Sequence, residues 1–137
     1  MWHVGVDLHR ESLMVAAVED RGKVRTPVRL ACTDVESIEG LFQTLRPFRV
    51  VIEATGNYRW LYRVLAPLGT VLLAHPLRLR AMVQRRSKTD RLDSQLLAQL
   101  LRLDQIPLSY IPSEEYQFLR DFMRYRTRLS RQLTQAK

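Results

Sequence analysis

Residues 88–101 read Lys88-Thr89-Asp90-Arg91-Leu92-Asp93-Ser94-Gln95-Leu96-Leu97-Ala98-Gln99-Leu100-Leu101, and their leucines recur at helical spacing. At roughly 100° per residue the leucines form one broad stripe, which predicts a helix that packs on the protein body. By the same arithmetic, Asp90 and Asp93 project on the leucine side. Because a carboxylate removed from water must be paired, hydrogen-bonded or bound to a metal, these two acids suggest a divalent-cation site.

A capping role for the two acids is the alternative. Acidic residues favour the first turn of a helix because of the macrodipole, and Ser87 with Asp90 resembles a capping box. A helix that begins at Ser87 or Thr89 leaves both aspartates near solvent. This stretch alone therefore leaves both interpretations open.

The composition is that of a globular protein with one domain. The chain has 137 residues, of which 46% are hydrophobic and 26% charged. Its single cysteine, Cys32, excludes an internal disulfide and a cysteine-pair metal site. No stretch reaches transmembrane length, and the N-terminus enters a strand pattern rather than a signal peptide. We therefore expect a cytoplasmic protein with no membrane partner.

The charge predicts a polyanionic partner, since the net charge is +8 and the pI about 10.4. One basic group precedes the leucine-rich helix: Arg78, Arg80, Arg85, Arg86, Lys88 and Arg91. A second basic group runs along the C-terminal segment and includes Arg120, Arg124, Arg126, Arg128, Arg131 and Lys137. Basic side chains beside an acidic cation site fit a phosphodiester substrate, with arginines on the backbone and acids on the metal. A solvated basic face is the alternative.

The order of predicted elements is that of an α/β protein. Alternating apolar residues predict strands over 2–8, 13–19 and 24–31, forming an antiparallel meander in which Pro27 favours an edge position for the third. Further strands are predicted at 48–53 and 70–74. Helices are predicted from Thr33, from Thr55, over 76–83 and from about Asp90 to Leu103. The crossovers between the later strands make those strands parallel, so the sequence predicts a mixed sheet of five strands.

The C-terminal part is predicted to leave this domain, which spans 1–105. Residues 106–112 contain two prolines and are predicted as a linker. A last helix begins at Ser113, within the segment 113–137, and carries the apolar residues Leu119, Phe122, Met123, Leu129 and Leu133. Because this helix has no capping residue at Lys137, we expect further protein to follow in the natural product.

Two more acids come at the ends of predicted strands. Asp7 ends the first strand and Glu53 ends the fourth. In open α/β sheets ligands bind beyond the carboxyl ends of the strands, so if these strands are neighbours the two acids stand side by side. With Asp90 and Asp93 they offer four hard oxygen ligands, which suit Mg²⁺ or Mn²⁺. The alternatives are that Asp7 is a turn residue, and that Glu53 pairs with Arg49 or caps the turn at Thr55–Gly56.

These residues fall into blocks that resemble a known family. The blocks are Val4-Gly5-Val6-Asp7-Leu8-His9, Val51-Ile52-Glu53-Ala54-Thr55-Gly56-Asn57-Tyr58, His75-Pro76, Lys88-Thr89-Asp90-Arg91-Leu92-Asp93, and Ile111-Pro112 through Arg124-Tyr125-Arg126. In this order they resemble the N-terminal DEDD domain of IS110-family transposases, bacterial insertion-sequence recombinases related to the Piv DNA invertase. The resemblance covers nearly the whole chain.

The resemblance implies an RNase H-like fold of the RuvC type, with Asp7, Glu53, Asp90 and Asp93 as the catalytic metal site. It implies a DNA recombinase that acts on element ends or branched DNA in the nucleoid, in some members guided by an RNA. The nucleic-acid contacts are then expected from Arg78, Arg80, Arg85, Arg86, Lys88, Arg91, Arg124 and Arg128.

The resemblance also implies parts beyond this chain. The family carries a C-terminal domain with a serine implicated in cleavage, which is absent here, so the chain alone is expected to cleave poorly. Its last helix resembles the start of the family's coiled coil and implies a homodimer or higher oligomer. The alternative is a module that keeps the fold but only binds nucleic acid or dimerises. A nucleotide phosphotransferase is disfavoured, because such proteins need a second glycine-rich phosphate loop and the five glycines of this chain are never adjacent.

Overall fold

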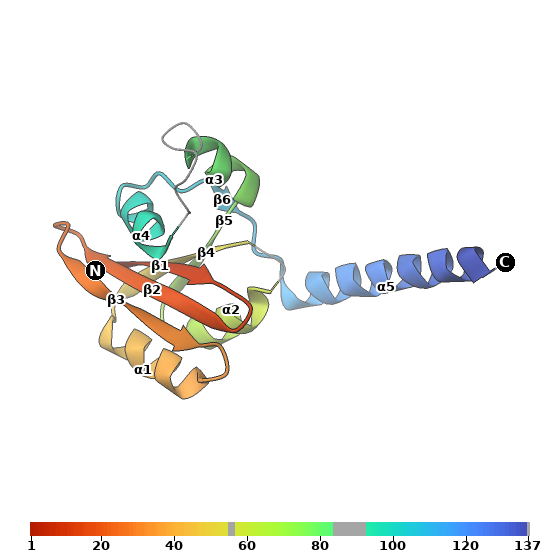
Figure 1. The fold of residues 1–137 in the computed structure, drawn as a ribbon, viewed down its shortest axis with the longest axis horizontal. Helices are drawn as coiled ribbons and strands as arrows, with labels where there is room; N and C mark the ends of the chain where they lie inside the picture. Colours follow the sequence, from red (N-terminus) through yellow and green to blue (C-terminus); the bar gives the residue numbers. More distant parts are fainter. Residues whose placement is uncertain (55–56, 84–92, 137) are drawn as a thin grey trace.

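The computed structural model describes residues 1–54, 57–83 and 93–136. It has a six-stranded sheet with helices on both faces and a long helix that projects from one side (Figure 1). The elements in chain order are β1 Trp2–Leu8, β2 Ser12–Glu19, β3 Val24–Ala31, α1 Val35–Thr44, β4 Phe48–Glu53, α2 Arg59–Leu65, β5 Thr70–Ala74, α3 Pro76–Val83, α4 Ser94–Arg102, β6 Leu108–Ser109 and α5 Glu114–Ala136.

The sheet has the strand order β3-β2-β1-β4-β5-β6. β1, β2 and β3 form the predicted antiparallel meander, and β4 and β5 continue the sheet in parallel from β1. Pro27 lies in the edge strand β3, as expected of a residue without an N–H donor. The mixed α/β architecture is therefore confirmed and is consistent with an RNase H-like fold.

The strand count needs a correction, because the predicted sheet has five strands and the structure has six. β6 pairs antiparallel with β5 through Leu73 and Ser109, within the segment predicted as a linker. The backbone N–H of His75 also donates to the carbonyl of Pro107 at 2.8 Å. A two-residue strand is too short to show an alternating pattern, so its pairing is decided by the neighbouring strand.

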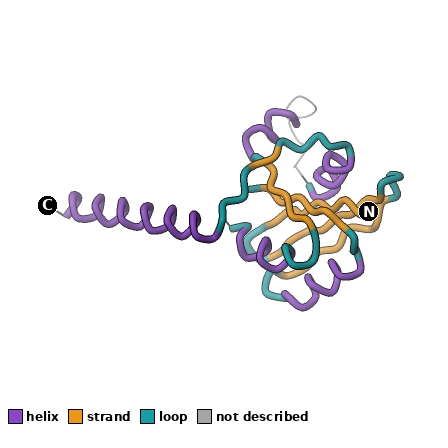
Figure 2. The backbone as a smooth tube through the Cα atoms, turned by 180° about the vertical axis from the view of Figure 1, so that it is seen from behind, coloured by secondary structure: helices purple, strands orange, loops and turns teal. Residues whose placement is uncertain are grey.

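Strand alternation gives the sheet two different faces. One face buries Val4, Val6, Val50 and Ile52 under α1 and α2. The other face packs against α3 and α4, and its buried apolar side chains are Val51, Ala74, Leu79, Leu97 and Leu101. The two views agree that α1 and α2 lie on one side of the sheet and α3 and α4 on the other (Figures 1 and 2).

α4 begins later than its sequence pattern predicts. Asp93 has extended backbone angles and is the N-cap, with its Oδ1 accepting from the Leu96 N–H at 2.8 Å. Its side chain is exposed, so the prediction that Asp93 lies within the helix and is directed at the protein body is wrong. The physical reason is that a capping carboxylate turns back toward the free N–H groups of the first turn. Asp90 lies outside the described residues.

The opposite end of α4 is held by a polar network. The Arg49 guanidinium donates to the Leu101 carbonyl at 2.7 Å, to Asp104 Oδ1 at 2.8 Å and to Nδ1 of the buried His3 at 2.9 Å. Since Nδ1 accepts, the ring proton of His3 resides on Nε2 and is donated to Asp20 at 2.6 Å. That hydrogen bond holds the pKa of Asp20 below its usual value. One arginine thus ties β1, β4 and α4 together.

Among the described residues, α5 is paired with the domain only near its beginning. Arg59 of α2 pairs with Asp121 at 2.8 Å, and Arg63 pairs with Glu114 at 3.0 Å. The hydrogen bond from Arg59 lowers the pKa of the Asp121 carboxyl. Beyond these pairs the helix extends away from the body (Figures 1 and 2), and its apolar side chains, including Phe122 and Leu129, are exposed.

Candidate metal centre

Asp7 and Glu53 lie at the carboxyl ends of two neighbouring parallel strands. The pairing of β1 with β4 runs to Val6 opposite Ile52, so Asp7 and Glu53 are the next residues along the two strands. Neighbouring strands are about 4.8 Å apart, and alternation directs both side chains to the face covered by α3 and α4. The two strands are therefore neighbours in the sheet, as the sequence predicts.

Glu53 has a carboxylate oxygen without a partner. Its side chain is 23% exposed, but Oε1 is buried and accepts no hydrogen bond from any described residue. The alternative that Glu53 pairs with Arg49 is wrong, because that guanidinium is engaged at the far end of the face. A buried anionic oxygen with no donor is costly, so this position favours a cation.

Asp7 has one hydrogen-bonding neighbour, His9. Its Oδ2 lies 3.0 Å from Nε2 of His9, a side chain that is exposed at the rim. The Asp7 side chain is 27% exposed and therefore remains accessible from solvent. Asp7 and Glu53 are thus two carboxylates on adjacent strand ends, one hydrogen-bonded and one unpartnered.

Gly5 lets α4 approach this part of β1 closely. A Cβ atom built on Gly5 would lie 2.2 Å from the Ser94 carbonyl oxygen and 2.6 Å from the Ala98 nitrogen. The first turn of α4 therefore rests directly on the β1 backbone, and Asp93 precedes this contact by one residue. A glycine between valines in a strand is a sequence signal for such an approach, and the sequence reasoning did not use it.

The described residues contain part of the predicted tetrad. Asp7, Glu53 and Asp93 are described, whereas Asp90 lies in the segment 84–92, which is not. Within the described ranges, no three His, Cys, Asp or Glu side chains lie close enough to hold one metal ion. The donor set nevertheless fits a hard divalent cation, because Glu53 offers an unpartnered oxygen beside a second carboxylate.

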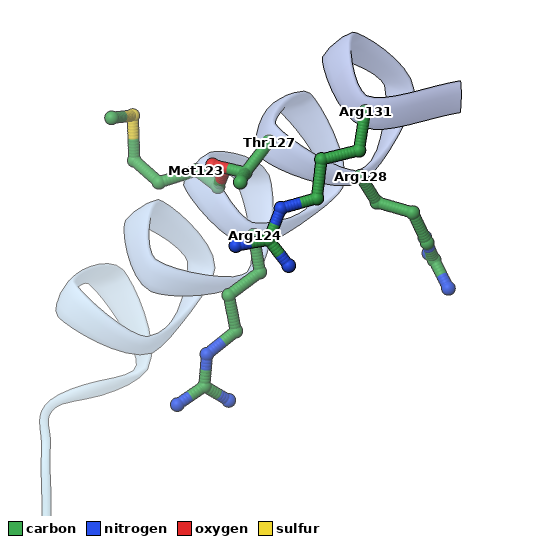
Figure 3. A pocket seen from close by; sticks show the side chains of 5 residues that line it. All are labelled: Met123, Arg124, Thr127, Arg128 and Arg131. Carbon is green, nitrogen blue, oxygen red and sulfur yellow. The ribbon is translucent and has the colours of Figure 1, made fainter. Parts of the chain in front are cut away.

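The predicted basic residues divide into two described groups. Arg78 and Arg80 are exposed on α3, and Arg80 Nη2 lies 3.9 Å from Glu53 Oε1. Arg124, Arg128 and Arg131 line a hollow on α5 with Met123 and Thr127 (Figure 3). The other predicted basic positions fall outside the described residues: Arg85, Arg86, Lys88 and Arg91.

Three further findings concern the kind of protein. In the described part of the chain, no helix is both long enough and apolar enough to cross a membrane. The IS110-type DEDD family model, described as "Transposase", matches residues 4–137. No curated protein matches the chain.

Proposed function

Because this chain belongs to the IS110-type family of DEDD transposases, we propose that it supplies the acidic metal centre for DNA strand cleavage and exchange. The observation that carries the proposal is the buried, unpartnered Oε1 of Glu53 next to Asp7 at the carboxyl ends of β4 and β1. Asp93 of the capped α4, and Asp90 in the segment before it, are proposed to complete the ligand set.

In this proposal each group has a distinct task. Asp7 and Glu53 would hold Mg²⁺ or Mn²⁺, and the ion would supply activation of the attacking oxygen and stabilisation of the leaving oxygen of a phosphodiester. Arg78 and Arg80, which are exposed on α3, hold the phosphate backbone in register with the acids. His9, which contacts Asp7, orients that carboxylate at the rim.

α5 is proposed to extend the nucleic-acid surface and to carry self-association. Arg124 and Arg128 are the contacts to DNA, or to a guide RNA, that the sequence predicts. The apolar side chains of the same helix are proposed to form the start of a coiled coil, since Leu119, Phe122, Leu129 and Leu133 are all exposed in the single chain.

A binding-only module of the same fold is the second candidate function. It is favoured by Asp93, which is exposed and commits Oδ1 to capping α4. In that case the acids contribute no metal site, and the basic helices α3 and α5 carry the function alone.

Metal-dependent stability separates the two candidates. We expect millimolar Mg²⁺ or Mn²⁺ to raise the Tm of the 137-residue chain, because a ligand that binds only the folded state stabilises it by about 2.7 kcal/mol at roughly 100 times its Kd. Asp7→Asn and Glu53→Gln should abolish the rise, while the metal-free Tm of Glu53→Gln should be no lower than that of wild type. Differential scanning fluorimetry measures both.

Glu39→Gln is the matched control, since Glu39 is exposed on α1 on the other face of the sheet. Its metal response should equal that of wild type. Ordinary carboxylate sites of this kind are saturated at about 10 mM metal. If the wild-type Tm stays constant between metal-free buffer and that concentration, the binding-only module is the correct function.

Salt dependence tests the proposed phosphate contacts. If Arg78, Arg80, Arg124 and Arg128 each neutralise one phosphate of duplex DNA, log K should fall with log salt with a slope of about −3.6. The double variant Arg124→Ala/Arg128→Ala should reduce the slope by about 1.8. Fluorescence anisotropy with a labelled branched duplex measures the slope.

The matched control is Arg25→Ala/Arg29→Ala, which removes two exposed arginines from the edge strand β3. β3 is one edge of the sheet, and β6, which precedes α5, is the opposite edge. If the β3 double variant lowers the slope as much as the α5 double variant, the assignment of the contacts to α5 is wrong.

A further inference from the structure

The only described cation near the unpartnered oxygen of Glu53 is Arg80. Its Nη2 lies 3.9 Å from Glu53 Oε1, which is beyond hydrogen-bond distance. The guanidinium therefore offsets part of the negative charge without satisfying the buried oxygen. The contact is an electrostatic pairing that a better ligand of the carboxylate can replace.

The two partners differ in how firmly they are held. Glu53 ends a central strand and its side chain is 23% exposed, whereas the Arg80 side chain is 62% exposed. Arg80 follows Leu79, a fully buried residue of α3 that packs this helix on the sheet. The arginine therefore has a fixed base and a long side chain that is free to reach into solvent.

We propose that Arg80 is an exchangeable counter-ion of Glu53 that couples cation binding to phosphate binding; this rests on the proposed function. Without metal, Arg80 stays over Glu53. A divalent cation bound to Glu53 repels the guanidinium, which then turns outward to a phosphate of the nucleic acid.

The coupling follows from charge and from thermodynamic reciprocity. Arg80 cannot serve Glu53 and a phosphate equally at once, so a cation at Glu53 frees it for the phosphate. If the cation raises the affinity for nucleic acid in this way, nucleic acid raises the affinity for the cation by the same factor. The pairing would thus favour metal binding where substrate is present.

The first test titrates Mn²⁺ alone into the 137-residue chain by calorimetry. Arg80→Gln removes the competing cation, so the variant should bind Mn²⁺ about threefold or more tightly than wild type. A variant that had lost its structure would bind Mn²⁺ more weakly, not more tightly. Arg78→Gln is the matched control, because Arg78 is an exposed arginine on the same helix with no ion pair to a described residue. Its Mn²⁺ affinity should stay within about twofold of wild type.

The second test needs no metal. Glu53→Gln releases Arg80, so the affinity for a labelled DNA duplex in EDTA should rise by about threefold or more. In the Arg80→Gln background the same Glu53→Gln change should give a much smaller rise. This double-mutant cycle separates release of Arg80 from the general effect of removing a negative charge.

The outcomes are distinguishable. An Arg80→Gln variant that binds Mn²⁺ no more tightly than wild type overturns the exchange, while Mn²⁺ binding by wild type still supports the proposed metal centre. Equal gains from Glu53→Gln in both backgrounds also overturn the exchange. A wild-type chain that binds no Mn²⁺ overturns the metal centre and the exchange together.

Discussion

Gly5→Ala should lower the Tm of this protein by roughly 10 °C, equivalent to about 3 kcal/mol of unfolding free energy. The new methyl group would lie 2.2 Å from the Ser94 carbonyl oxygen and 2.8 Å from Leu97 Cβ. Two of its three nearest atoms belong to the α4 backbone, so the helix must move off β1 rather than rotate one side chain. Thermal unfolding followed by circular dichroism measures the effect.

The same substitution at Gly40 provides the control. Gly40 lies inside α1, and a Cβ built there has open space around it. Alanine is the better helix former, so Gly40→Ala should raise the unfolding free energy by about 0.5–1 kcal/mol. A Gly5→Ala protein as stable as wild type would show that α4 does not rest on β1 as described.

Gly5→Ala should also change the metal response of the domain. Asp93 immediately precedes the residue whose carbonyl faces Gly5. Moving this turn shifts Asp93 relative to Asp7, so the rise in Tm that metal produces should be smaller for the variant than for wild type. If the variant folds and its rise in Tm equals that of wild type, Asp93 is not in the proposed ligand set.

Arg49→Ala should lower the unfolding free energy by about 2 to 3 kcal/mol. The substitution removes the donor to Nδ1 of His3, which is 5% exposed, and the donor to the Leu101 carbonyl at the end of α4. Both acceptors are then left without their partner in a partly buried place, which costs more than the loss of an exposed hydrogen bond. Urea unfolding at neutral pH measures the change.

Arg25→Ala is the matched control for Arg49→Ala. Arg25 also lies on a strand, but its guanidinium makes an exposed hydrogen bond of 3.2 Å to Thr44. Its removal should change the unfolding free energy by less than about 0.5 kcal/mol. Equal effects of the two substitutions would contradict the special role assigned to the His3–Arg49 network.

The sequence predicts most of the sheet because its signals are local. Val4, Val6, Val50 and Ile52 alternate with residues of the other face, and this pattern sets both the strands and the side that each acid takes. The predicted helix over 76–83 agrees with α3, whose first residue is a proline, as is common at helix starts. The neighbouring positions of Asp7 and Glu53 follow from these local patterns and the parallel crossover.

What the sequence did not predict depends on contacts between distant segments. The leucine spacing continues upstream of Ser94, so periodicity could not reveal that α4 begins after Asp93. β6 exists because the edge of β5 is available, and the partners of Arg49 lie 46 to 55 residues away. The convergence of all four predicted acids remains a prediction, because Asp90 lies outside the described residues.

Because α5 is attached to the domain near its beginning, the length of the helix sets how far its distal arginines lie from that attachment. At 1.5 Å per residue its 23 residues span about 34 Å, and in the described part of the chain its ion pairs with α2 occur only as far as Asp121. Arg131 is ten residues further along, so it stands about 15 Å beyond the last anchor. A phosphate held by Arg131 would therefore lie well away from the last ion pair that joins α5 to the domain.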